Sequence, residues 1–323
     1  MNSRGVAPGV TRRDFVSGLG AFFLSPLLLP RTLRGSDLSP DLKPLRLGFL
    51  TDVHAMAEMN APAWMESSAS LMNSLKPDLI IGGGDFVHGG FQSPGSVMDG
   101  RWKLASSFLS RLQAPLQPVI GNHDFYEPLK ADGTPAPGDP RRRWKEHFGL
   151  PSTYRSFSWK GYRFLLLDSV QVVGGKDRYE GRIDAAQLAW LDRELEGIPR
   201  NEPIILCTHV PFRTVLMNAP DVFGGGGRVH VLNSDLVLER LRGRPLALIL
   251  QGHVHLSEKL PLGESSGVPC ITGGAVCGKW WKGPNMGTNP GLGLIEILPA
   301  GYAPSSPAWS YNDTPAPLPP ART

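Results

Sequence analysis

The sequence predicts an α/β protein built as a sandwich of two β-sheets with helices on the outer faces. Short, nearly continuous apolar runs, which are typical of strands buried on both faces, alternate with stretches of helical periodicity. One pair of strand-like segments follows without a helix between them, which adds antiparallel pairing and makes the sheets mixed. With 323 residues, 41% of them hydrophobic and 19% charged, the chain is long enough to bury a large core.

Five apolar runs are the expected strands, and each ends in a polar cluster: 45–51, 78–84, 117–120, 203–208 and 246–251. Helical spacing of apolar residues predicts helices between them, at 64–75, 101–112, 185–195 and 235–242. Asp184 and Ser234 are the expected N-caps of the last two. A hairpin is expected to turn at Lys160–Gly161, and further strands are expected at 270–272 and 292–298.

Three parts of the chain differ in composition. Residues 1–43 are predicted to be an export signal with a linker, 44–298 the folded domain, and 299–323 a C-terminal tail rich in Pro and Ala. The chain holds three cysteines without a CxxC pattern. Cys270 and Cys277 are interpreted either as a disulfide pair or, together with Cys207, as small core hydrophobes.

The N-terminal segment resembles a twin-arginine export signal. Arg12 and Arg13 stand directly before a run of mostly apolar residues that is short for a membrane span. We therefore expect the Tat export machinery to deliver the protein to the periplasm or the extracellular space. An ordinary signal peptide and an uncleaved membrane anchor are the alternatives. No stable membrane association is expected unless the leader is retained.

The positive charge of the chain is concentrated in the same segment. The formal net charge is +4, and residues 1–43 hold six basic and three acidic residues. The remaining chain is therefore close to neutral, which argues against a nucleic-acid-binding surface.

The polar clusters after the five strands contain the residue types that bind metal ions: Asp52 and His54; Asp85; Asn122, His123 and Asp124; His209; His253 and His255. Loops at the carboxyl ends of parallel strands converge on one crevice. Residues two apart on an extended segment point the same way, so each spaced pair can aim two ligands at one centre. A lone carboxylate such as Asp85 can bridge two ions with its two oxygens. Imidazoles combined with carboxylates favour zinc, iron or manganese.

These blocks resemble the signature of the calcineurin-like metallophosphoesterases. All five appear in order between residues 45 and 298, and their spacing is most similar to the cyclic-nucleotide phosphodiesterase branch. Purple acid phosphatases are less similar, because His88 stands where a Tyr ligand would be expected. The metallo-β-lactamase motif is absent, since Ser257 occupies its Asp position.

The resemblance implies a four-layer αββα sandwich and two transition metal ions, iron, manganese or zinc. Asp52, His54 and His255 would bind one ion; Asn122, His209 and His253 the other; and Asp85 would bridge them. A hydroxide bridging the ions would attack the phosphorus of a small-molecule phosphate ester, with a phosphodiester favoured. A phosphomonoesterase of the same fold and a non-catalytic metal-bound binding protein are the alternatives.

Several further residues near the motifs allow two interpretations each. His123 is the candidate either to protonate the leaving oxygen or to stabilise its charge, with Asp124 orienting it. His88 either touches the substrate or makes a local hydrogen bond, and Arg213 either reaches a phosphate or is an ordinary loop residue. Trp280 and Trp281 either stack on a base or sugar or pack the loop onto the sandwich.

Overall fold

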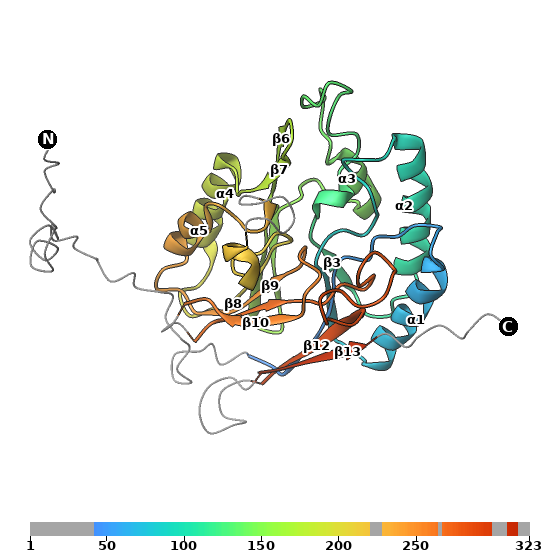
Figure 1. Cartoon of the computed structure of the whole chain (residues 1–323). Helices are drawn as coiled ribbons and strands as arrows, with labels where there is room; N and C mark the ends of the chain where they lie inside the picture. The colour runs from blue at the N-terminus through green and yellow to red at the C-terminus, as the bar shows by residue number, and fades with distance from the viewer. Residues whose placement is uncertain (1–41, 220–227, 264–266, 299–308, 316–323) are drawn as a thin grey trace, which may run out of the picture.

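The computed structural model describes residues 42–219, 228–263, 267–298 and 309–315. Within these residues two mixed sheets form the centre of the protein (Figure 1), in the order β13-β12-β1-β2-β3 and β10-β11-β9-β8-β5-β4. The strands of the first sheet are β1 (Leu45–Leu50), β2 (Leu79–Gly82), β3 (Leu116–Pro118), β12 (Gly291–Ile297) and β13 (Trp309–Pro315). Those of the second are β4 (Arg155–Trp159), β5 (Tyr162–Leu166), β8 (Ile204–Cys207), β9 (Leu246–Gln251), β10 (Glu258–Pro261) and β11 (Pro269–Thr272).

The two sheets bury an apolar layer between them. Leu47 and Phe49 of β1 belong to the same buried cluster as Phe164 of β5, Ile205 of β8 and Leu250 of β9. Each large apolar side chain removed from water contributes roughly 1.5–3 kcal/mol, so this layer holds the sheets together. Within each sheet the central strands are parallel, and β12, β13, β4 and β10 add antiparallel edges.

Helices cover the outer faces of the sandwich (Figure 1). On one side α1 (Ala61–Ser74) packs against α2 (Gly95–Leu109), and on the other α4 (Ala185–Gly197) packs against α5 (Ser234–Arg240). Short helix α3 (Arg142–Phe148) and two 3₁₀ turns (Asn122–Asp124 and Val215–Asn218) lie in the connections. The predicted four-layer α/β sandwich is confirmed.

Local details confirm some expectations and correct others. Asp184 caps α4, since its carboxylate accepts a hydrogen bond from the backbone N–H of Gln187. The N-cap of α5 is Asn233 rather than Ser234, and the Asn233 carboxamide bonds both backbone groups of Ile183 instead. The predicted hairpin joins β4 and β5, and its two turn residues Lys160 and Gly161 have φ values of 50° and 85°.

Within the segment expected to be a C-terminal tail, the described residues Trp309–Pro315 form strand β13 beside β12. The hairpin of β6 (Val170–Gly174) and β7 (Arg178–Gly181) forms a separate two-stranded sheet. Cys207, Cys270 and Cys277 are buried and unpaired, as the core interpretation expects. Among the described residues no helix is long and apolar enough to span a membrane. The predicted export signal lies outside them.

Candidate metal centre

The polar clusters at the strand ends come together at one edge of the sandwich. In the first sheet they follow β1, β2 and β3, and in the second they follow β8 and β9. These strands run parallel within each sheet, so their carboxyl ends share an edge. The side chains expected to bind metal are all buried there: Asp52, His54, Asp85, Asn122, His209, His253 and His255.

The backbone at these residues is bent into an unusual conformation. Left-handed φ values between 47° and 75° occur at Asp52, His54, Asp85, His253 and His255. The expectation that Asp52 and His54 align on an extended segment is therefore wrong. Each non-glycine residue in this region costs roughly 1–3 kcal/mol, and surrounding structure must hold it. Backbone hydrogen bonds from Asp52 N to Gly84 O and from His54 N to Asp85 O, each 2.9 Å, do so.

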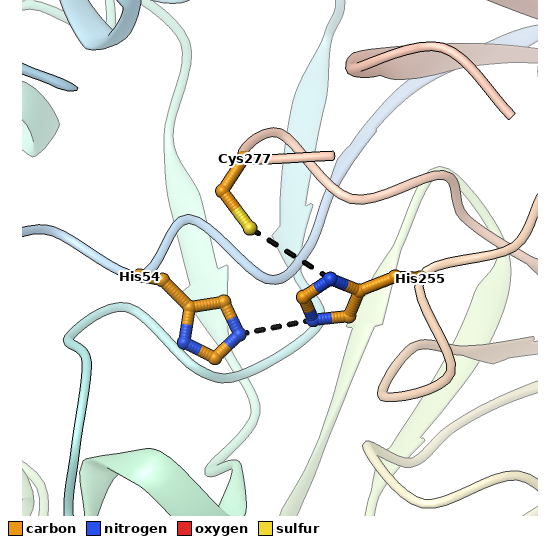
Figure 2. Close-up of side chains that lie close together, drawn as sticks. All are labelled: His54, His255 and Cys277. Atoms are coloured by element: carbon orange, nitrogen blue, oxygen red, sulfur yellow. Dashed lines mark hydrogen bonds between the residues drawn. The ribbon is translucent and has the colours of Figure 1, made fainter. Parts of the chain in front are cut away.

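Asp52, His54 and His255 form the first group of donor atoms. The Nε2 atoms of His54 and His255 lie 3.1 Å apart and face each other (Figure 2). Asp52 Oδ1 lies 3.2 Å from His255 Nε2 and 3.7 Å from His54 Nε2. This oxygen is buried and has no hydrogen-bond partner among the described residues. A buried carboxylate oxygen without a partner indicates that a cation belongs beside it.

The second group gathers around His209. Its Nε2 lies 3.1 Å from Asn122 Oδ1 and 3.2 Å from Asp85 Oδ2. Donor atoms of Asp85, His209 and His253 all lie within 4.8 Å of one another. The Nε2 of His253 donates to the carbonyl oxygen of Arg228 at 2.6 Å, so Nδ1 is the nitrogen that would meet an ion.

Asp85 connects the two groups through a single oxygen. Its Oδ2 lies 3.5 Å from His54 Nε2 of the first group and 3.2 Å from His209 Nε2 of the second. Its Oδ1 accepts a hydrogen bond from the backbone N–H of His123 at 2.6 Å. The expectation of a bridge that uses both oxygens is therefore corrected, because only Oδ2 faces both groups.

The donor atoms fit two transition metal ions. With ligand distances of about 2.0–2.2 Å, neighbouring donors on one ion lie roughly 3.0–3.5 Å apart. The donor separations in both groups, 3.1–3.7 Å, fall within or just beyond this range. The mixture of imidazole nitrogens with carboxylate and carboxamide oxygens is the set that zinc, iron and manganese accept.

Backbone carbonyls orient the imidazoles from behind. His209 Nδ1 donates to Gly83 O at 2.8 Å, and His255 Nδ1 donates to Gly278 O at 2.6 Å. These bonds leave the Nε2 atoms of both rings available to face an ion. Cys277 lies behind His255, with its sulfur 3.8 Å from Nδ1, and not between the two imidazoles (Figure 2).

Charges within the centre oppose the effect of burial on the pKa of His209 and add to it at His253. Burial alone would lower the pKa of His209, but the Asp85 carboxylate raises it to about 9. Burial lowers the pKa of His253 to about 4, and the neighbouring His209 adds to this effect. Because a ligand nitrogen must be deprotonated, a metal ion entering the second group would displace the proton of His209.

His123 and Asp124 lie beside the donor groups and make different contacts from those expected. The Nδ1 of His123 accepts a hydrogen bond from the backbone N–H of Gly89 at 2.8 Å. The Asp124 carboxylate accepts four backbone N–H bonds of 2.7–3.2 Å, from Asp85, Phe86, Val87 and Gly121. Asp124 therefore fixes the loop that carries Asp85, and its carboxylate is engaged with that loop rather than with the His123 ring.

A cavity of about 450 Å³ opens directly over the donor groups, a size suited to a small ligand. Asp85, Asn122, His253 and His255 form part of its wall. The remaining wall includes the imidazoles His88 and His123, the aromatic side chains Phe91, Tyr179 and Trp280, and the guanidinium groups of Arg178 and Arg228. The seven predicted ligands thus lie at or beneath the wall of one cavity.

The residues near the motifs that allow two interpretations lie in different places. His88 and Trp280 line the cavity, while Trp281 is buried and donates from Nε1 to the carbonyl of His54 at 3.0 Å. Arg213 is exposed and does not belong to the cavity wall. His147 and His230, which have no motif around them, also lie outside this wall.

Comparison with known proteins identifies the family. Residues 45–257 match the family model described as calcineurin-like phosphoesterase. The chain belongs to the calcineurin-like phosphoesterase family.

Two curated relatives are cyclic-nucleotide enzymes. The chain is 30% identical over 209 residues to a cAMP/cGMP dual specificity phosphodiesterase of Mycobacterium tuberculosis, a match that covers 64% of this chain and 56% of that enzyme. It is 25% identical over 229 residues to a 3',5'-cyclic-nucleotide phosphodiesterase of Nostoc, covering 66% of this chain and 72% of that enzyme. The chain thus spans little more than half the length of the mycobacterial relative.

Solved structures share the fold. A dimetal phosphatase from Danio rerio superposes with a TM-score of 0.57 at 14% identity, covering 84% of this chain and 99% of that one. A purple acid phosphatase from yellow lupin superposes with a TM-score of 0.55 at 12% identity, covering 85% of this chain and 52% of that one.

In this calcineurin-like phosphoesterase, several residues of the site lie outside the sequence motifs. Arg228 and Gly278 act through backbone carbonyls, so no side chain marks their contacts with the imidazoles. Arg178 and Tyr179 reach the cavity from the β6–β7 hairpin. The glycines before the ligands do carry a signal: a Cβ at Gly84 would lie 2.6 Å from His209 Nδ1, so the close approach requires glycine.

Proposed function

We propose that the chain is a dinuclear-metal phosphoesterase that hydrolyses small phosphodiesters. The observation that carries this proposal is the position of Asp85 Oδ2 between two groups of donor atoms in the wall of a ligand-sized cavity. In the proposal Asp52, His54 and His255 hold one ion, Asn122, His209 and His253 hold the other, and Asp85 bridges them. The donor set suits iron, manganese or zinc.

Two bound ions would supply a water that ionises near neutral pH and would neutralise the charge of the phosphoryl oxygens. The protein's own part is to place and orient the reacting groups. His123 accepts from Gly89 N–H at Nδ1, so its proton is on Nε2. A neutral His123 would stabilise the charge on the leaving oxygen by donating a hydrogen bond to it, which is favoured here over full protonation of that oxygen. Asp124 acts as a positioning residue for Asp85.

The side chains that line the cavity support a diester over a monoester. Tyr179 lies near the second donor group, with its ring 6.0 Å from that of His253, and Arg228 stacks on Tyr179. Trp280 lies near the first group, with its ring 4.8 Å from that of His255. Walls on both sides of the centre provide a place for each of two organic substituents on the phosphorus. The curated relatives named as phosphodiesterases support the same preference.

The test of this function is the hydrolysis of bis(4-nitrophenyl) phosphate by the metal-loaded protein. We expect Asn122→Ala and His209→Ala each to lower the rate by roughly 10²-fold or more and to lower the metal content, because each removes a donor from the second ion. Release of 4-nitrophenol and elemental analysis measure the two effects.

Arg213→Ala is the matched control, since Arg213 is exposed and outside the cavity wall. We expect it to retain wild-type rate and metal content. Full activity in either Asn122→Ala or His209→Ala would refute the second metal site. A wild-type protein that cleaves 4-nitrophenyl phosphate but not the diester would favour a phosphomonoesterase, and one that binds metal but cleaves neither would favour a binding protein.

We further propose that the protein is exported by the Tat machinery as a folded, metal-loaded enzyme. The support is the Arg12–Arg13 pair before the apolar run. Replacement of both arginines by lysine is expected to block export and leave the protein inside the cell, because the twin-arginine pair is the feature that this route recognises. Fractionation with an activity assay measures it. Unaltered export of this variant would indicate an ordinary signal peptide instead.

A further inference from the structure

The loop after β11 brings one aromatic ring against the centre of the cavity. The indole of Trp280 lies 4.5 Å from the ring of His54, 4.8 Å from His255, 5.1 Å from His88 and 5.3 Å from His123, measured between ring centroids. Trp280 is half-buried and lines the cavity. One side chain therefore contacts two residues of the first donor group and both imidazoles that lie outside the donor groups.

A tight turn fixes this position. Trp281 N donates to Cys277 O, and Lys279 N donates to Gly283 O, each at 2.8 Å. Cys277, at the start of this turn, is hydrogen-bonded to the first donor group, because its N–H donates to Asp52 O at 3.2 Å. The turn also presents the Gly278 carbonyl that orients His255. The same short segment thus orients a metal-binding imidazole and places an indole beside it.

The two tryptophans in the turn have different tasks. Both have left-handed backbone, with φ values of 55° at Trp280 and 63° at Trp281, which is costly for bulky side chains. Trp281 has a structural explanation, because its buried indole donates to the His54 carbonyl. The Trp280 ring faces the cavity instead, so its left-handed backbone places the indole in the cavity wall.

The surroundings of Trp280 define what it would contact. His123, the proposed donor to the leaving oxygen, lies 5.3 Å from it between ring centroids. Met56 and Met59 add apolar surface to the same cavity. A group leaving from the phosphorus toward His123 therefore meets an aromatic and apolar surface.

We propose that Trp280 forms a subsite that selects phosphate esters with a planar aromatic leaving group, such as an aryl or heteroaryl substituent. This inference rests on the proposed function and specifies its substrate class. A planar ring can stack on indole with a gain that a small alkyl group does not obtain.

The experiment compares two non-hydrolysable anions, phenylphosphonate and methylphosphonate, as ligands of the metal-loaded full chain in titration calorimetry. They present the same phosphoryl head and differ in the ring. We expect phenylphosphonate to bind about tenfold more tightly, near the lower end of the effect of one aromatic stacking contact. In Trp280→Ala the preference is expected to fall to about one to twofold, and Trp280→Phe is expected to retain part of it.

Lys279→Ala is the matched control, because Lys279 is exposed in the same turn and does not line the cavity. It should keep the wild-type preference. Metal content and thermal unfolding of each variant show whether the turn is intact. If Trp280→Ala loses metal, the comparison of the two phosphonates is made with Trp280→Phe.

An unchanged preference in Trp280→Ala, or no preference in the wild type, would overturn the subsite. Failure of both phosphonates to bind the metal-loaded protein would contradict the proposed function itself, so the two failures are distinguishable.

Discussion

We expect Asp85→Asn to lower the hydrolysis of bis(4-nitrophenyl) phosphate by roughly 10³-fold or more and to reduce the metal content of the protein. In the wild type, Oδ1 accepts from His123 N–H, and Oδ2 faces both donor groups. Asparagine can keep the first contact with its carbonyl oxygen. Its amide nitrogen then replaces Oδ2, and its N–H groups point at the positions where the cations bind. The variant is nearly isosteric, so the loss reports on the bridge rather than on packing.

The control for this prediction is Asp192→Asn, which makes the same chemical change on exposed surface of α4. It is expected to keep wild-type rate and metal content, because an exposed ion pair contributes little to stability. An Asp85→Asn protein that keeps two ions and more than a tenth of the activity would show that a single bridging oxygen is not needed.

The second large effect is expected for His123→Ala, which should lower kcat by about 10²-fold while the metal content stays unchanged. Burial lowers the pKa of His123 well below its usual range, in agreement with a neutral ring that carries its proton on Nε2. A donor to the leaving oxygen matters most where that oxygen develops much charge. The loss should therefore be larger for a diester that releases phenol than for one that releases 4-nitrophenol.

Steady-state kinetics with both diesters and elemental analysis measure this prediction. An equal loss with both leaving groups would mean that His123 does not act on the leaving oxygen. A loss of metal in His123→Ala would instead indicate that the His123 ring binds one of the ions.

The sequence predicts where the candidate ligands lie in the fold, because each of them directly follows a buried strand. A strand buried on both faces must be apolar, so it is visible as a run, and its carboxyl end is visible as the first polar residue after the run. Asp52, His209 and His253 are found in this way. The resemblance to a family then assigns them to two ions, and the structure places the two groups on either side of Asp85 Oδ2.

Side-chain partners and backbone bends could not be predicted because they depend on contacts between distant segments. The left-handed backbone at Asp52 and His54 is held by carbonyls of residues 84 and 85, and nothing in the local sequence favours it. Asp124 was expected to orient its neighbour His123. Its carboxylate instead meets backbone N–H groups of residues 85–87, which come close only after β2 and β3 pair.

The same reason applies to elements with weak patterns. Strand β13 lies in a segment rich in Pro and Ala, and its place is set by pairing with β12 along its whole length. Trp280 and Trp281 are adjacent and chemically identical, so the sequence cannot tell which one packs and which one faces the cavity. The turn from Cys277 to Gly283 decides this, because its hydrogen bonds send one indole to the His54 carbonyl and the other to the cavity.

The central claim is that one chain holds two transition metal ions joined by Asp85. Elemental analysis of an active preparation tests it most directly, with the metal-to-protein ratio followed alongside diesterase activity as a chelator removes the metal. We expect about two ions per chain and activity that disappears with them. An active preparation with no more than trace metal would contradict the claim.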